Sequence, residues 1–421
     1  MKKRAYKATK VKALNLHNLN KQVKGKDIVF AIDVAKEKFM GSIMTADKQV
    51  IITIKWDHPT ETSQLLDILV NKLSWHSLDV AMEPSGTYGD SIRFQFQERG
   101  IAVYRVSPKR THDASEIYDG VPSSHDAKSC AIIGRLHLDG FSEEWCRQDE
   151  SQRVLVATLT MMEIFDDAYG RNINRLEALV ARYWPELPQY LKLRSASLLV
   201  LLATFGCPAA VAASAEEAGE LMRKIGGSSL KEDKINGVIA SADSTLGVTC
   251  LEAEQKLMRE LAQEVRRLQK NRNQARTRIE LMTQEIEEVQ QMTPMMGKVT
   301  SAVLYVILGN MKMYDNAGSV VKALGLNLKE HSSGAHKGQL HITKRGSGSA
   351  RFYIYMAVLR LIKGNKIIKA WHHAKVKRDG GIKMKSIAAI MRKIAAALWH
   401  VGQGSKFDAS KLFDTSRLAI S

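Results

Sequence analysis

The chain has 421 residues, with 62 Lys and Arg against 44 Asp and Glu, and therefore a net charge of +18 near pH 7. Hydrophobic residues make up 45% of the sequence and only 8 residues are Pro, which excludes a largely disordered chain and favours two or three domains. The longest apolar run, Ala196 to Phe205, is too short to cross a bilayer, so we expect no membrane span. No hydrophobic segment follows the basic N-terminus, and the 4 Cys are widely separated, which favours a reducing cytoplasm over secretion, disulfides or a zinc site.

Residues 1–26 form the first segment, with nine Lys or Arg and no acidic residue. We interpret this segment as a basic N-terminal arm. Two roles stay open for it, because such a tail is often a solvated, disordered arm but also suits contact with a polyanion.

Residues 27–148 are expected to form an α/β domain with a mixed sheet, since early strands are followed by a β-α-β-α order. The strand segments are short and rich in β-branched residues, and helical patterns lie between or after them. The expected strands are residues 27–32, 39–45, 49–55, 78–82 and 101–106, and the expected helices are residues 59–73, 87–99 and 125–138.

Residues 149–292 read as helical, and their second half carries an apolar stripe with alternating steps of four and three. About four such heptads predict a coiled coil, although an intramolecular helical hairpin would show the same periodicity. We expect Thr293-Pro294 to end this region. The stripe consists of Leu261, Val265, Leu268, Ala275, Ile279, Met282, Ile286 and Val289, with Arg272 at the one missing core position.

Residues 293–404 are expected to form a compact helical domain with one irregular loop at 331–338, and residues 405–421 a short tail that frays. Within this domain, residues 329–393 contain sixteen Lys or Arg against two acidic residues. Their basic residues alternate with apolar runs that must be folded. A folded basic face most often contacts a polyanion, so we expect nucleic acid as partner or substrate.

Two carboxylates are candidates for a metal site in the first domain. Asp33 closes the first predicted strand and Glu83 closes the fourth, and the carboxyl ends of parallel neighbours lie at one sheet edge. Carboxylates together with substrate phosphates are ligands that Mg²⁺ prefers, and Asp126 is a possible third. An acid at a strand end is also frequently only a cap or a turn residue, so this alternative stays open.

A serine in the basic domain is a candidate nucleophile. Ser333 is followed by Gly334, and glycine lets a backbone approach a phosphate closely. Cationic neighbours could stabilise charge on a phosphorane-like transition state, although a flexible Ser/Gly loop explains the same residues. Ser332, Ser347 and Ser349 carry the same two interpretations. The neighbouring cations are Lys329, Lys337, Lys344, Arg345 and Arg351.

Three segments of the first domain resemble the signature blocks of the DEDD-type insertion-sequence transposases, the IS-one-ten family related to Piv-type invertases. These blocks begin at Asp33, Met82 and Asp119 and read DVAKEKF, MEPSGTY and DGVPSSHD. Blocks of the second domain follow in the right order, from residue 323 to 410, whereas residues 185–250 show no family motif. The C-terminal blocks read ALGL at 323–326, SG at 333–334, ITKRG at 342–346, MRK at 391–393 and FDAS at 407–410.

The resemblance implies an N-terminal RuvC-like (ribonuclease H-like) domain, a coiled coil and a C-terminal domain with a catalytic serine. Family members excise and insert their own element, and several use a structured bridge RNA to choose donor and target DNA. It further implies that four acids bind Mg²⁺ while serine forms a covalent phosphoserine-DNA link, which keeps the phosphodiester's free energy for rejoining. Serine and metal site from different protomers of a homo-oligomer, a dimer or tetramer, would account for the coiled coil.

Carried over by position, Asp33, Glu83 and Asp126 match the first three acids, and Ser129 stands where the family has the fourth. A neutral hydroxyl is a weaker Mg²⁺ ligand than a carboxylate. Three alternatives follow: the chain holds a metal through three carboxylates and water, it binds a second ion only with DNA present, or it is catalytically weak. Asp113, Glu116 and Asp119 are near enough in sequence to substitute. The nucleophile is assigned to Ser333 when counted forward from Ala323, and to Ser332 when counted back from Lys344.

The sequence therefore predicts an RNA-guided DNA recombinase that uses Ser333 and Mg²⁺. Two alternatives remain. A RuvC-like nuclease would hydrolyse junction DNA with water as nucleophile, and its cleavage would need Asp33 and Glu83 but not Ser333. A nucleic-acid-binding remnant that lost its fourth acid would bind RNA or DNA tightly without breaking any strand.

Overall fold

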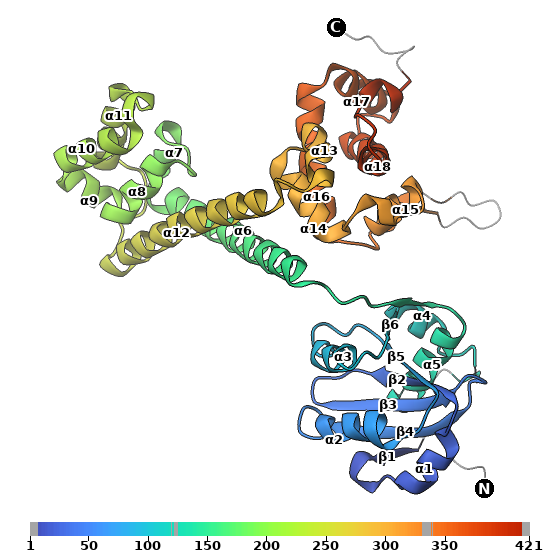
Figure 1. The fold of residues 1–421 in the computed structure, drawn as a ribbon. Helices are drawn as coiled ribbons and strands as arrows, with labels where there is room; N and C mark the ends of the chain where they lie inside the picture. The colour runs from blue at the N-terminus through green and yellow to red at the C-terminus, as the bar shows by residue number, and fades with distance from the viewer. Residues whose placement is uncertain (1–6, 119, 122–124, 331–337, 339, 415–421) are drawn as a thin grey trace. The chain divides into compact units, whose positions relative to one another are not determined.

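The computed structural model describes residues 7–118, 120–121, 125–330, 338 and 340–414. The chain divides into two compact units, Met1–Gln148 and Asp149–Ser421 (Figure 1). Three predicted site residues, Ser332, Ser333 and Lys337, lie outside the described residues. Among the residues that are described, no helix is both long and apolar enough to span a membrane.

The first unit is built on a seven-stranded mixed sheet with the strand order β1-β4-β3-β2-β5-β6-β7. β2, β3 and β4 pair antiparallel as a meander, whereas β2, β5 and β6 pair parallel. This confirms the predicted α/β class with a mixed sheet and is consistent with a ribonuclease H-like domain. The strands are β1 Ala8–Lys10, β2 Asp27–Asp33, β3 Lys38–Thr45, β4 Val50–Asp57, β5 Ser77–Met82, β6 Val103–Val106 and β7 Ser142–Glu144.

Helices cover both faces of the central strand β2, which explains why it reads as a continuous apolar run. Ile28, Phe30 and Ile32 pack into the core under α1, α2 and α3. Val29 and Ala31 point the other way and pack against α5. The helices are α1 Leu16–Val23, α2 Thr62–Asp67 with a π-helical turn at Ile68–Lys72, α3 Asp90–Gln97, α4 Pro108–Asp113 and α5 Asp126–Leu138.

The prediction of a basic N-terminal arm is wrong for residues 8–23, because these residues are part of the folded first unit. β1 pairs parallel with β4, and α1 follows it. Val11, Leu19 and Val23 are buried in the core of the first unit. These three apolar side chains supply enough burial to fix the segment, while its Lys residues remain on the outside.

The second unit begins with two long helices, α6 Glu150–Tyr183 and α12 Glu252–Thr283, which pack along one another (Figure 1). The residues between them form a small helical cluster around the buried Trp184, whose indole nitrogen donates to Ser241 Oγ at 3.1 Å. Residues 185–250, which show no motif, are therefore a folded helical insertion. Its helices are α7 Leu187–Tyr190, α8 Ala196–Phe205, α9 Pro208–Ala213, α10 Ala215–Gly226 and α11 Glu232–Asp243.

The predicted heptad stripe is buried inside the chain, between α12 and α6. Val265 and Leu268 pack in the core of the helical insertion, and Ala275 and Ile279 pack with α6 and the C-terminal helices. Arg272 at the gap in the stripe places its guanidinium 4.3 Å from the centre of the Tyr169 ring. The heptad stripe therefore belongs to two helices of the same chain, which is the intramolecular alternative to a coiled coil. A coiled coil between chains stays a prediction.

The prediction that the helical region ends at Thr293-Pro294 is wrong. The long helix α12 ends at Thr283, and α13 Glu287–Met296 contains Pro294. Pro294 has no backbone N–H, so α13 lacks one hydrogen bond of its last turn, and the helix ends two residues later at Met296. The Thr293 hydroxyl also donates to the Val289 carbonyl at 2.7 Å.

The C-terminal part is a helical bundle around α18, joined to a two-stranded hairpin. The expected fraying is wrong for residues 405–414, because Ala409 and Phe413 are buried in this core and Lys393 Nζ donates to the Leu412 carbonyl at 2.6 Å. The elements are α14 Lys298–Leu308, α15 Ala317–Ala323, β8 Leu328–Lys329, β9 His341–Ile342, α16 Gly348–Gly364, α17 Lys366–Arg378, α18 Lys383–Gly402 and a 3₁₀ turn at Ala409–Lys411.

Candidate active site

Asp33 and Glu83 lie at the same edge of the sheet. β2 and β5 are parallel neighbours in a register that pairs Ile32 with Met82, so the two acids occupy the next position on each strand. The strands are parallel neighbours, as the sequence argument required. Both carboxyl groups are partly buried.

Asp126 reaches this edge from the other direction, as the first residue of α5. The helix packs against β2 and β3, and the Cys130 thiol donates to the Met40 carbonyl of β3 at 3.1 Å. His125 caps the helix, since its Nδ1 accepts from the Lys128 backbone N–H at 3.2 Å. Ser129 follows Asp126 by three residues and lies on the same side of α5.

The neighbouring groups change the pKa of Asp33. Burial, followed by the charges of Asp126 and Glu83, raises the pKa of Asp33 to about 6. A hydrogen bond from the Ser129 hydroxyl acts in the opposite direction and lowers the pKa of Asp33. Burial also raises the pKa of Glu83, and a hydrogen bond from the Thr111 hydroxyl lowers it. Asp33 is therefore influenced by the other three predicted residues of this site, Glu83, Asp126 and Ser129.

Cys130 lies beside the acids but is a poor nucleophile. Burial, together with the neighbouring charge of Asp33, raises the pKa of the Cys130 thiol well above its ordinary value. A thiol reacts as its thiolate, so this residue is expected to be inert. The Cys130 thiol instead links α5 to β3 through its hydrogen bond to the Met40 carbonyl.

The donor types at this edge are ones that suit Mg²⁺, but the carboxylates are not gathered into a metal site. Within the described ranges, no group of three or more His, Cys, Asp or Glu side chains is close enough to hold an ion. The acids do interact electrostatically, which reaches further than coordination, and a cation would relieve the repulsion that raises the pKa of Asp33. Carboxylate and hydroxyl oxygens are the hard ligands that Mg²⁺ prefers, and it commonly completes its shell with water and phosphate.

The sequence did not predict that Thr111 is a partner of Glu83 or that Lys128 is buried. Thr111 on α4 contacts Glu83, and nothing in its basic surroundings marks it as a partner of an acid. Lys128 is only 2% exposed, and its ammonium group donates to the Val121 carbonyl. No signal in the sequence marks Lys128, because its burial becomes visible only in the structure.

The alternative fourth acids gain no support from their positions. Asp113 is exposed, and its carboxylate accepts from Lys109 Nζ at 2.6 Å, which lowers its pKa. Glu116 is exposed. Asp119 lies outside the described residues. Among the described residues considered for this position, Ser129 is the one whose side chain acts on Asp33.

In the second unit, the β8–β9 hairpin carries the flanks of the predicted serine loop. Lys329, Lys344 and Arg345 are exposed on these flanks. Arg351, on the first turn of α16, donates to the carbonyls of Leu324 at 3.1 Å and Gly346 at 2.9 Å. Arg351 therefore serves to hold the base of the hairpin.

Gly346 makes this base possible, since a Cβ there would lie 2.1 Å from the carbonyl oxygen of Ala323. The Lys344 backbone N–H donates to the Gly325 carbonyl at 2.9 Å across the same crossing. The two neighbouring serines have structural partners. Ser347 Oγ caps α16 by accepting from the Ala350 N–H at 3.1 Å, and the Ser349 hydroxyl donates to Glu163.

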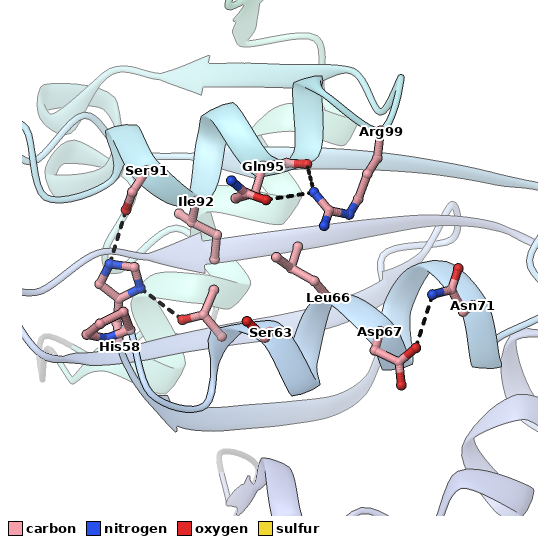
Figure 2. Close-up of a pocket in the computed structure, with 11 residues that line it drawn as sticks. His58, Ser63, Leu66, Asp67, Asn71, Ser91, Ile92, Gln95 and Arg99 are labelled. Atoms are coloured by element: carbon pink, nitrogen blue, oxygen red, sulfur yellow. Dashed lines mark hydrogen bonds between the residues drawn. The ribbon is translucent and has the colours of Figure 1, made fainter.

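A pocket of about 380 Å³ lies between α2 and α3 in the first unit (Figure 2). His58 Nδ1 is 2.9 Å from Thr62 Oγ1, and His58 Nε2 is 3.1 Å from Ser91 Oγ. Burial lowers the pKa of His58, which keeps the ring neutral at pH 7. None of the predicted site residues lines this pocket.

Residues 288–373 match the family model described as the Transposase IS116/IS110/IS902 family. The match supports a transposase of the IS110 family. It runs from α13 into α17 and spans the hairpin that carries the predicted serine loop, whereas the acids of the first unit lie outside it. No curated protein matches the chain.

Proposed function

We propose that this protein is a transposase that excises and inserts its own insertion sequence through a phosphoserine-DNA intermediate. The observation that carries the proposal is the transposase family match, because the matched residues 288–373 enclose the predicted nucleophile Ser333. The acid edge of the first unit supports it, since a RuvC-like domain would place its carboxylates at the same strand ends. The substrate is DNA at the element ends and at the target.

In the proposed reaction, Ser333 Oγ attacks the scissile phosphorus while its proton passes to a base. A new bond joins serine to phosphorus, one bond from phosphorus to a sugar oxygen breaks, and that oxygen takes up a proton. The number of phosphoester bonds is unchanged, so rejoining needs no external energy. Lys329, Lys344 and Arg345 stand on the flanks of the loop, where their charge would stabilise the transition state. Lys337 is proposed to act with them.

Asp33, Glu83 and Asp126 are the residues that would hold Mg²⁺, with Ser129 as a weaker fourth ligand. When bound, the ion would supply positive charge to a phosphate oxygen. With its pKa at about 6, the Asp33 carboxylate is ionised above neutral pH and takes up a proton on acidification. Mg²⁺ affinity is therefore expected to fall as the pH drops through 6.

A structured bridge RNA and a homo-oligomer complete the proposal. Both come from the family resemblance, and the basic excess of residues 329–393 is compatible with holding RNA as well as DNA. In the proposed assembly, Ser333 of one protomer works with the acids of another.

The experiment uses the full chain expressed with its natural flanking DNA. Co-purifying RNA is sequenced, and the complex is incubated with labelled element-end and target DNA in Mg²⁺ and run on a denaturing gel. We expect one enriched structured RNA and a protein-DNA adduct that Ser333→Ala abolishes. Ser332→Ala is the matched control and should keep the adduct. An adduct that survives Ser333→Ala but not Ser332→Ala would move the nucleophile by one residue.

The assembled acid edge also favours a second candidate, a metal-dependent junction nuclease. Such an enzyme would use water as nucleophile, so it would release cleaved DNA without an adduct and would need Asp33 and Glu83 but not Ser333. The hydroxyl of Ser129 in the fourth position favours a third candidate, a binding remnant, which would retain nucleic acid and break no strand at any Mg²⁺ concentration.

A further inference from the structure

One face of α17 carries four exposed basic side chains. Lys366, Lys369, His373 and Lys377 are spaced by three, four and four residues, so they line one side of the helix, and all four are exposed. We call these four residues the α17 lysine face. The opposite side of α17 is buried through Ile368 and His372, which fixes the direction in which the lysines point.

No ion pair among the described residues accounts for the lysines of this face. Across the part of the chain that the structure describes, no carboxylate is ion-paired with Lys366, Lys369 or Lys377. By contrast, Lys375 on a different side of α17 pairs with Asp379 at 2.7 Å.

The placement is also unfavourable for the helix itself. Lys366 and Lys369 stand in the first turn, where the helix dipole is positive, and this turn contains no acidic residue. Like charges three and four residues apart repel each other as well. A bound polyanion would convert both penalties into attraction. Local conflicts of this kind are expected at functional sites.

We propose that the α17 lysine face is a docking surface for the phosphate backbone of duplex DNA. The proposal rests on the transposase function and names the element of the second unit that grips its substrate. The face runs from Lys366 to Lys377, twelve residues that extend about 16 Å along the helix, over which a DNA duplex presents several phosphates. Duplex DNA is favoured over single-stranded RNA because the four residues of this face include no Phe, Tyr or Trp for base stacking, and His373 is the one ring among them. The nearby Trp371 is partly buried and packs on Phe413, with ring centres 4.8 Å apart.

The test is the salt dependence of DNA binding by the full chain. Binding of a fluorescent DNA duplex is measured by anisotropy at rising KCl for the wild type and for the triple variant Lys366→Gln, Lys369→Gln, Lys377→Gln. Each lost phosphate contact lowers the slope of log affinity against log salt by about 0.9, so the triple variant should lose about 2.7. The matched control is Lys224→Gln, Lys231→Gln, Lys234→Gln, which removes the same charge from exposed positions of the helical insertion and should leave the slope unchanged.

An unchanged slope in the α17 variant, or an equal fall in the control, would overturn the proposal. A loss confined to RNA, structured or single-stranded, with binding of duplex DNA intact, would overturn it as well and would assign the face to RNA. The Ser333-dependent adduct separates this result from the proposed function. Adduct formation together with an unchanged slope would refute the α17 lysine face alone, whereas a wild type that binds no duplex DNA would refute both.

Discussion

Replacing Asp33 by Asn is expected to stabilise the first unit at neutral pH in the absence of metal. The pKa of Asp33 is about 6 in the folded protein and 3.8 as the reference value. The folded state thus binds the proton more tightly than the unfolded state does. Stability therefore falls as the pH rises from about 4 through 6, and at pH 7.5 the ionised carboxylate opposes folding.

The size of this penalty follows from the shift. A difference of 6 − 3.8 is about two pKa units, which corresponds to about 3 kcal/mol at pH 7.5 and about 0.5 kcal/mol at pH 4. Asp33 is only partly buried, so solvent screening reduces the expected gain from Asp33→Asn to about 1–3 kcal/mol at pH 7.5. Near pH 4 the variant should differ little from the wild type.

The assay is native-state hydrogen exchange at the backbone amides of β2 and β5, with a metal chelator present and with correction for the intrinsic exchange rate. This readout reports on the first unit alone, which matters because a chain with two units need not unfold in one step. The expected result is greater protection in the variant at pH 7.5 and equal protection near pH 4. A gain of the same size at both pH values, or a loss at pH 7.5, would refute the electrostatic reasoning. Added Mg²⁺ should stabilise the wild type and leave the variant unaffected.

Two further predictions concern the fourth ligand and the serine loop. Ser129→Asp should raise Mg²⁺ affinity by about tenfold or more, about 1.4 kcal/mol, measured by calorimetry, because it adds a carboxylate to the acid edge; an unchanged or weaker affinity would show that this position does not face the metal. Gly346→Ala should cost about 1–3 kcal/mol in urea unfolding and abolish adduct formation, since its Cβ would collide with backbone at 2.1 Å. Gly364→Ala, where a Cβ meets nothing within 4 Å, is the control and should be neutral.

Much of the first unit could be predicted because its central strands have long apolar runs. The predicted strands at 27–32 and 78–82 correspond to β2 and β5 within one residue at each end. β1 and β7 were missed because each has three residues, too few to show a period. The helix α1 was missed because charge dominated its segment, although its buried Leu19 and Val23 already stood four residues apart.

The second unit shows where sequence periodicity stops being informative. A heptad stripe reports that one side of α12 is buried, but not which helix buries it, and the partner here is α6 of the same chain. Pro294 predicts the end of the helical region at the wrong position. The long helix ends before residues 284–286, and this turn contains neither Gly nor Pro to mark it in the sequence.

The acid site was partly predictable for a different reason. Asp33 and Glu83 were found because strand ends converge, which follows from topology alone. The hydrogen bond from Thr111 to Glu83 depends on how α4 packs after β6, and no local pattern encodes that contact.

The central claim is that Ser333 becomes covalently joined to DNA. The most direct test is to trap the wild-type reaction with Mg²⁺ and cognate DNA, digest both components and locate the nucleotide-linked peptide by mass spectrometry. The account predicts a phosphodiester on Ser333, absent when Asp33→Asn removes the metal site. Cleaved DNA with no linked peptide, or a linkage to any other residue, would contradict it.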